Sequence, residues 1–270
     1  MSKLIVSANS LEHLKKLLKE NIDGVILSVK DLAVNDSYYV DIDLVDFSLF
    51  KGKEVFFSIN KLMHNSDLDK VRTFLEKVKD KDVKLIFYDM AVYNIACELG
   101  IVDKLVIAQD HLNASTLSNN FYYDLGIKTS YITSDITMEE LLNIKHNSKI
   151  KVMFLGYGYA PIFYSRRYLI NNYLEFINRD NDGKEYKIVS DTNIKYPIKE
   201  EKYGTTIYTP EVINLVNYID DLKEIDYLVL KSNMIDNNDF IEMTRKFINH
   251  EHVDNAYLGF LNTKTIYKIK

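Results

Sequence analysis

The sequence predicts a single-domain (β/α)8 barrel, similar to a TIM barrel, of the α/β class that extends over residues 1–270. Short apolar, β-branched runs recur at intervals that leave room for one helix between successive runs. The chain of 270 residues is 47% hydrophobic, which is enough to bury a core of barrel size. With only 3 prolines and 9 glycines, the chain shows no tract that resembles a linker between two halves. An open doubly wound sheet is the main alternative.

Eight runs are candidates for the parallel strands, because strands buried on both faces read as nearly continuous apolar segments. They are Leu4–Val6, Gly24–Leu27, Glu54–Phe57, Val83–Phe87, Lys104–Ala108, Thr129–Thr133, Ile150–Leu155 and Tyr227–Leu230. Eight strands that alternate with helices are typical of a closed barrel.

Helix-start signals stand between these runs. Ser10 precedes an amphipathic stretch that begins at Leu11, and Ser66 precedes another that spans residues 68–78. Thr137 is followed three residues later by Glu140, which is the pattern of a capping box. The sequence therefore predicts a helix after at least three of the strands.

The regular spacing is interrupted once, before the eighth run. A turn cluster at 178–183 is followed by Tyr186–Val189 and Thr205–Tyr208, which flank a polar stretch. We interpret these two runs as an antiparallel β-hairpin inserted at about 178–208. An insertion after a late strand would cover the C-terminal face of the barrel, where active sites of this architecture lie.

The charge and the cysteine content limit the function classes. A formal net charge of −5 argues against a general phosphate-binding surface, so we expect no DNA partner, although a local basic patch could bind RNA. The single cysteine, Cys97, excludes an intramolecular disulfide and a metal site of several cysteines. Its helical setting favours a buried thiol in the core. No metal-ligand spacing stands out elsewhere.

The chain begins directly with a strand pattern and contains no apolar window as long as a membrane span. We therefore expect a cytoplasmic protein with no membrane association.

The most informative segment runs from Val152 to Tyr173. It combines an apolar strand, a glycine-punctuated loop and paired arginines that open a helix-like run. The segment resembles the signature of the collagenase-like peptidases, peptidase family U32. Gly158 and Arg167 stand at the signature's glycine and arginine, whereas Pro161 and Tyr168 stand at two of its cysteines. Because those cysteines can ligate iron and sulfur in the family, the resemblance implies that this chain has no cofactor of its own.

Further matches to the family follow in the same order along nearly the whole chain. They are Asp23–Leu32, Ser58–His64, Phe87–Val92, Leu125–Glu140, Tyr208–Val212, Leu228–Lys231 and Gly259–Lys270. The chain is most similar to the short, cysteine-poor paralogues that accompany a larger, cysteine-bearing member, a pair linked to 5-hydroxylation of the wobble uridine in tRNA. The resemblance implies a cluster-free accessory subunit whose partners are the larger paralogue and tRNA. A peptidase and a non-catalytic scaffold are the alternatives.

Candidate binding residues surround the signature. Arg166 and Arg167 are candidates to bind a phosphate or a carboxylate, since guanidinium groups form bidentate hydrogen bonds with these anions. Tyr157 and Tyr164 could stack unpaired bases beside them. Lys231, at the lysine of a family element, completes this set. The arginine stems could instead pack on neighbouring tyrosines, and the tyrosines could form core or a partner interface.

Polar residues that follow apolar runs form a second set, because strand ends meet at the mouth of a barrel. Asn60 is a binding candidate in this set, while His64 and Asp135 are candidates for catalysis, as is Ser165 if a histidine such as His64 activates it. The same residues could equally be helix caps or turn formers. Because no standard catalytic motif is present, the sequence assigns no catalytic residue.

Overall fold

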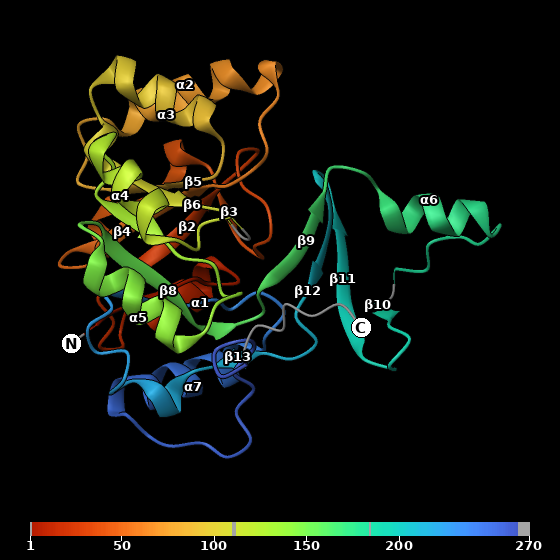
Figure 1. The fold of residues 1–270 in the computed structure, drawn as a ribbon. Helices are drawn as coiled ribbons and strands as arrows, with labels where there is room; N and C mark the ends of the chain where they lie inside the picture. The colour runs from red at the N-terminus through yellow and green to blue at the C-terminus, as the bar shows by residue number, and fades with distance from the viewer. Residues whose placement is uncertain (1, 110–111, 184, 264–270) are drawn as a thin grey trace.

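Eight parallel strands close into a barrel in the computed structural model, which describes residues 2–109, 112–183 and 185–263. The strands are β1 (Lys3–Val6), β2 (Gly24–Val29), β4 (Glu54–Ile59), β5 (Lys84–Phe87), β6 (Leu105–Ala108), β7 (Thr129–Tyr131), β8 (Lys151–Gly158) and β14 (Tyr227–Leu230). They pair in this order, and β14 pairs back with β1 (Figure 1). The prediction of a (β/α)8 barrel is confirmed at all eight strands, and the open sheet is wrong.

Helices pack outside the barrel between most of the strands (Figure 1). They are α1 (Leu11–Leu17), α2 (Leu68–Val78), α3 (Met90–Leu99), α4 (Thr116–Asp124), α5 (Met138–Asn147) and α7 (Asn237–Asn249), with short turns η3 (Asn65–Asp67), η4 (Val102–Lys104) and η5 (Val216–Tyr218). Two of the predicted caps are confirmed, since Ser10 accepts from the His13 N–H and Thr137 forms a capping box with Glu140. Ser66 instead lies inside η3, and Asp67 stands at the N-cap of α2 without a side-chain hydrogen bond to that helix. Among the described helices, none is long and apolar enough to span a membrane.

The segment between β2 and β4 departs from the barrel pattern. It contains a two-residue strand, β3 (Tyr39–Val40), and two 3₁₀ turns, η1 (Ile42–Leu44) and η2 (Phe47–Phe50), in place of an α-helix. Asp41 and Asp46 cap the two turns by accepting hydrogen bonds from the backbone.

The prediction of a buried thiol is wrong, because Cys97 is exposed. Helix α3 buries Val92, Ile95 and Ala96 against the barrel. Ile95 and Ala96 lie three and four positions after Val92, and the three residues therefore share one face of the helix. Cys97 lies beside that face, on the part of the helix that is exposed to solvent.

The interior of the barrel is filled by side chains from all eight strands. One layer contains Ile5, Ile26, Phe56, Ile86, Val106, Met153 and Val229. At the N-terminal end, Glu54 accepts hydrogen bonds from Lys3 and Lys84 and from the Tyr227 hydroxyl (3.2 Å). The lower half of the barrel is therefore a packed core, and active sites of this architecture lie at the C-terminal face.

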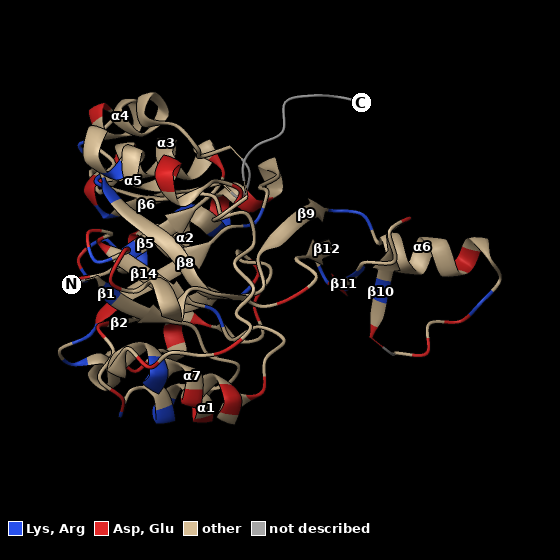
Figure 2. Cartoon of the chain, turned by 60° about the horizontal axis from the view of Figure 1, so that its bottom comes forward, with Lys and Arg blue, Asp and Glu red and all other residues tan. Residues whose placement is uncertain are grey.

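An inserted unit, here called the arm, spans residues 161–208. It contains β9 (Pro161–Ser165), α6 (Leu169–Phe176), β10 (Tyr186–Val189), β11 (Lys195–Glu201) and β12 (Gly204–Tyr208). The strands form an antiparallel sheet in the order β10-β11-β12-β9, and the arm projects away from the barrel (Figures 1 and 2).

The two strands of the expected hairpin are present, but they do not pair with each other. Strand β11 lies between β10 and β12, and the inserted unit begins at Pro161 with β9 rather than at about residue 178. The polar residues of β11 and its Pro197 conceal a strand in the sequence. They are tolerated because the arm sheet is only partly buried.

Buried hydrogen bonds fix the base of the arm on the barrel. Thr206 donates to the Asn35 side chain, and the Asn233 amide donates to the Asn35 carbonyl oxygen (3.2 Å) and to the Tyr208 hydroxyl (3.2 Å). Tyr39, from the loop after β2, donates to Glu201 on β11 (3.0 Å). Because buried polar groups that all find partners specify one arrangement, the arm is held in a defined position at the barrel mouth.

Candidate functional site at the barrel mouth

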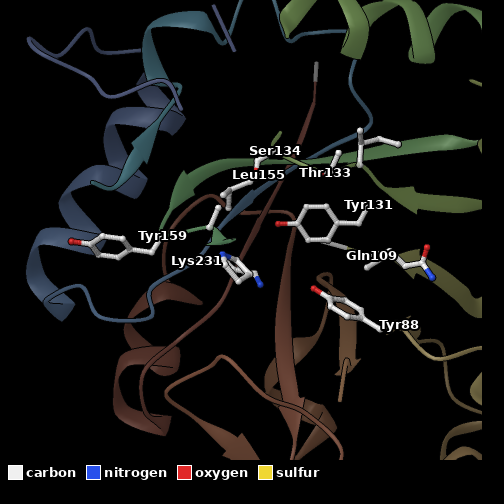
Figure 3. Close-up of a pocket in the computed structure, with 12 residues that line it drawn as sticks. Tyr88, Gln109, Tyr131, Thr133, Ser134, Leu155, Tyr159 and Lys231 are labelled. Atoms are coloured by element: carbon white, nitrogen blue, oxygen red, sulfur yellow. The ribbon is translucent and has the colours of Figure 1, made fainter. Parts of the chain in front are cut away.

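A small pocket with a cavity volume of about 30 Å³ lies at the carboxyl ends of the barrel strands. Its lining includes Tyr88, Gln109, Tyr131, Thr133, Ser134, Leu155, Tyr159 and Lys231 (Figure 3). We call this site the mouth pocket. Its walls come from β5 to β8, β14 and the first residues of the arm, so it joins the barrel to the insertion.

The strand pleat directs three side chains into this pocket. Tyr88 follows Ile86 by two residues, Lys231 follows Val229 by two, and Tyr131 ends β7. Residues two apart in a strand share a face, so these side chains continue the rows that fill the barrel interior. Both tyrosines pack on the interior layer.

Lys231 supplies the charge of the mouth pocket. It is the only Lys or Arg among the described residues that line the pocket. Its Nζ lies 6.0 Å from the ring centroid of Tyr131, and the hydroxyls of Tyr88 and Tyr131 point toward it (Figure 3). An ammonium group beside two phenols, with aromatic faces nearby, can bind an anionic or carbonyl oxygen while a planar ligand stacks against the rings.

Gly158 allows Lys231 to take this position. Its φ is +131°, and the Lys231 N–H donates to the neighbouring Tyr157 carbonyl oxygen (2.8 Å). A Cβ atom at Gly158 would lie 2.7 Å from the Lys231 carbonyl oxygen. Only glycine combines this φ with such a close approach of two backbones, which gives the glycine of the family signature a structural role.

A buried carboxyl group lies close to the same lysine. Asp36 accepts from the Ser28 hydroxyl at the end of β2, and its N–H donates to the Tyr39 hydroxyl (3.2 Å). Burial raises the pKa of Asp36, and the positive charge of Lys231 opposes this rise. Asp36 therefore connects the floor of the barrel mouth, through Tyr39, to Glu201 of the arm.

Sequence reasoning missed Asp36, Tyr88 and Tyr131. Tyr88 directly follows an expected strand, so the strand-end rule that selected Asn60 could have found it. Asp36 sits in a loop segment, and nothing in the sequence shows that this loop turns back over the barrel.

The structure places the predicted binding residues apart from one another. Tyr157 is 8% exposed and packs against Phe240 and Phe247 of α7, outside the mouth pocket. Burial raises the pKa of Tyr157 to about 12. The Asn60 amide exchanges hydrogen bonds with the Val34 backbone (2.9 and 3.1 Å), which commits it to holding a loop. Of the predicted binding residues, only Lys231 lines the mouth pocket.

Arg166, Arg167 and Tyr164 lie on the arm, at the end of β9. The Tyr164 hydroxyl donates to the Tyr203 carbonyl oxygen (2.7 Å), and burial raises the pKa of Tyr164 to about 12. Arg166 lies close enough to Asp67 to help lower the pKa of that carboxyl, while Arg167 is exposed. Arg166 therefore faces the loop after β4, and neither arginine lines the mouth pocket.

The candidates for catalysis do not form a triad. The Ser165 hydroxyl accepts from the Arg167 N–H (3.2 Å), and among the described residues it has no bond to His64. His64 is exposed at the start of η3, where its N–H donates to Asp67 (2.9 Å). Asp135 is exposed outside the mouth pocket. Within the described ranges, no group of three His, Cys, Asp or Glu side chains could hold a metal ion.

The fold and this pocket define a barrel protein with a pocket at the C-terminal face and an arm beside it. The family profile described as Peptidase family U32 matches residues 9–259. The chain therefore belongs to peptidase family U32.

Comparisons with individual proteins add a relative and two similar folds. The tRNA hydroxylation protein P2 of Bacillus subtilis (strain 168) is 26% identical over 189 residues, which cover 67% of this chain and 60% of that protein. A mutant tryptophan synthase α-subunit from Pyrococcus furiosus aligns over 92% of this chain and 98% of its own, with 13% identity and a TM-score of 0.48. An orotidine 5'-monophosphate decarboxylase from Sulfolobus solfataricus aligns over 93% and 99%, with 9% identity and a TM-score of 0.46.

Proposed function

We propose that this chain is an accessory subunit for the 5-hydroxylation of the wobble uridine in tRNA and carries no iron–sulfur cluster of its own. The observation that carries the proposal is the mouth pocket, in which Tyr88, Tyr131 and Lys231 converge, in a chain similar to a tRNA hydroxylation protein. RNA-modifying proteins hold a splayed base by stacking and by hydrogen bonds to its edge.

The residues that line the pocket offer both kinds of contact for a uracil ring, although the cavity of about 30 Å³ must widen to admit the ring. The rings of Tyr88 and Tyr131 offer apolar faces for stacking, and the Lys231 ammonium can donate to a carbonyl oxygen of the base. In this proposal the pocket selects and orients the wobble base. The oxidising chemistry is supplied elsewhere.

A larger, cysteine-bearing paralogue is the proposed partner that supplies this chemistry. An iron–sulfur cluster commonly requires four thiolates, and this chain has one cysteine. Within the proposal, tRNA bridges the two subunits, and the accessory chain presents the base.

Nucleoside mass spectrometry of total tRNA tests the function. A deletion strain is complemented with the wild-type chain, with Lys231→Met, or with Lys79→Met, which changes an exposed lysine at the end of α2. We expect the deletion and Lys231→Met to lack nucleosides derived from 5-hydroxyuridine, and the wild type and Lys79→Met to restore them. Normal levels in the deletion strain would reject the function. If Lys231→Met restored these nucleosides, the Lys231 ammonium would not be required, and the chain would be a scaffold without a ligand site.

A further inference from the structure

A second pocket of about 340 Å³ lies on the arm. Its lining includes Tyr159 and Tyr186, and it contains two lysines and two glutamates, Lys187, Lys199, Glu185 and Glu200. We call it the arm groove. Tyr159 also lines the mouth pocket, so the two cavities adjoin at this residue. A ligand that is long enough could therefore occupy both.

The arm differs in charge from the rest of the chain. Residues 161–208 contain eight Lys or Arg and seven Asp or Glu, a net charge of +1, whereas the remainder of the chain carries −6. The negative charge of the barrel therefore repels a polyanion, and the arm does not. This difference in charge favours an approach from the side of the arm.

The arm also exposes apolar and aromatic side chains in unusual density. Phe163, Tyr173, Phe176, Ile188 and Val189 are all exposed. Contiguous exposed apolar surface marks a binding site, and aromatic side chains interleaved with cations are the pattern that holds unpaired nucleotides. The same four-stranded antiparallel arrangement, with aromatic residues on its surface, serves RNA recognition in other folds.

Two neighbouring residues of β10 carry the contact chemistry of the arm groove. The Tyr186 hydroxyl donates to Asp182 (2.9 Å), which fixes the ring at the groove wall. Lys187 is exposed, and no ion pair holds its ammonium among the described residues, in contrast to Lys199, which pairs with Glu201 (2.5 Å). Both residues line the arm groove, although consecutive residues of a strand point to opposite faces of its sheet, so the ring and the ammonium would contact different parts of one ligand.

We propose that the arm groove binds unpaired nucleotides of an RNA loop, with bases on Tyr186 and Tyr159 and a phosphate on Lys187. This inference rests on the proposed function and adds the path of the substrate, because nucleotides beside the modified base lie along the arm while that base enters the mouth pocket. The two aromatic rings and the ammonium of Lys187, which no ion pair holds among the described residues, favour RNA over a protein chain as the occupant.

Fluorescence anisotropy with a labelled tRNA anticodon stem-loop, measured on the full chain, tests the inference. We expect Tyr186→Ala to weaken binding by about 5- to 150-fold, since stacking of one base contributes on the order of 1–3 kcal/mol and 1.4 kcal/mol is tenfold. Tyr186→Phe keeps the ring and should bind within about twofold of the wild type. Lys187→Gln should lower the slope of log affinity against log salt by about 0.7 to 1.

The matched controls lie on the opposite part of the barrel. Phe121→Ala removes an exposed aromatic side chain of α4, and Lys79→Gln removes an exposed charge of α2, and neither should change RNA affinity. Circular dichroism and thermal melting show whether Tyr186→Ala disturbs the fold, and Lys187→Gln serves as the test if it does. Photocrosslinking with 4-thiouridine RNA should label peptides that contain Tyr159 or Tyr186.

Three outcomes would overturn the proposal that the arm groove binds RNA. They are wild-type affinity in both Tyr186→Ala and Lys187→Gln, crosslinks confined to residues outside the arm, and no RNA binding by the wild-type chain. If Tyr186→Ala or Lys187→Gln lost a protein partner while its RNA affinity stayed unchanged, the groove would be a protein-binding site instead. If one of these outcomes occurs and the deletion strain lacks the wobble-uridine modification, RNA binding in the arm groove is rejected but the proposed function stands. A deletion strain with normal modification rejects the proposed function separately.

Discussion

The carbonyl oxygen of Lys231 lies 2.7 Å from the point where a Cβ atom would stand at Gly158. This close contact lies between β8 and the residue after β14. It fixes the position from which the Lys231 side chain extends into the mouth pocket. The family signature and the pocket are thus connected through backbone packing, although Gly158 itself contributes no side chain.

Replacement of Gly158 by alanine should therefore affect both stability and function. The added Cβ meets backbone atoms, and alanine is strained at a φ of +131°. We expect a loss of about 2 kcal/mol or more in the free energy of unfolding and loss of tRNA modification. Gly52→Ala is the control, because φ is +77° there and nothing lies within 4 Å. Equal melting temperatures of the two variants would contradict the packing argument.

Lys231→Met should separate function from stability. The side chain is only partly buried and makes no ion pair among the described residues, so we expect the melting temperature to stay within a few degrees of the wild type. The substitution keeps an apolar stem of similar length while it removes the donor. The pocket model predicts no modified wobble nucleoside in the complemented deletion strain. A modified nucleoside at the wild-type level in that strain would count against a role for the ammonium.

The paired arginines should contribute to RNA binding from the arm. We expect Arg166→Ala combined with Arg167→Ala to abolish wobble-uridine modification while the barrel stays folded, and to lower the salt slope of RNA binding by up to about 2. Because Arg166 also faces Asp67, the single variant Arg167→Ala should account for at least half of the change. Arg72→Ala on α2 is the control. Unchanged modification in the double variant would restrict both arginines to a structural role.

The stability of the protein should fall in mild acid because of His13. This residue is 1% exposed, its Nδ1 accepts from the Asn9 N–H (3.1 Å), and its ring meets Phe240 edge-on. Burial, with a smaller effect of Lys16, lowers the pKa of His13 from 6.5 to about 4. Between these two values the unfolded chain binds more protons than the folded chain, so stability is lost as pH falls through this window.

At pH 5 this effect should amount to about 2 kcal/mol relative to pH 8. Urea unfolding at both pH values measures it, and His13→Leu should remove that part of the pH dependence. His252→Gln, which changes an exposed histidine, should keep it. An identical pH dependence in His13→Leu and the wild type would show that other groups cause the loss.

The isolated chain should contain no iron–sulfur cluster. Cys97 lies exposed on α3, and it is the only cysteine of the chain. Anaerobic purification followed by iron and sulfide determination should give values near zero for the wild type and for Cys97→Ala. Stoichiometric iron and sulfide in the wild type would refute the assignment of the cluster to a partner.

The sequence predicted the barrel well because the evidence for each strand is local. Runs such as Val83–Phe87 and Tyr227–Leu230 are buried on both faces, and continuous apolar character reveals that state without knowledge of neighbours. Strand β11 was missed for the opposite reason. Its first residue is exposed and the others are only partly buried, so their polarity resembles that of a loop.

The candidate site was predicted only in part. Lys231 was selected from a family match, and the structure places it in the mouth pocket. Tyr157 was selected for its neighbours in sequence, but the pleat of β8 turns it toward α7. Proximity in sequence to Arg166 therefore did not place the two side chains in one site.

The sequence alone determined the family, the eight strands and the absence of enough cysteines for a cluster, since each depends on composition or on local periodicity. The tertiary structure decided which side chains share a pocket. Tyr88, Tyr131 and Lys231 come from strands that are distant in sequence, and only closure of the barrel brings the ends of those strands together. The position of the arm was decided in the same way, because the buried bonds of Asn35 and Asn233 with the arm form across long sequence separations.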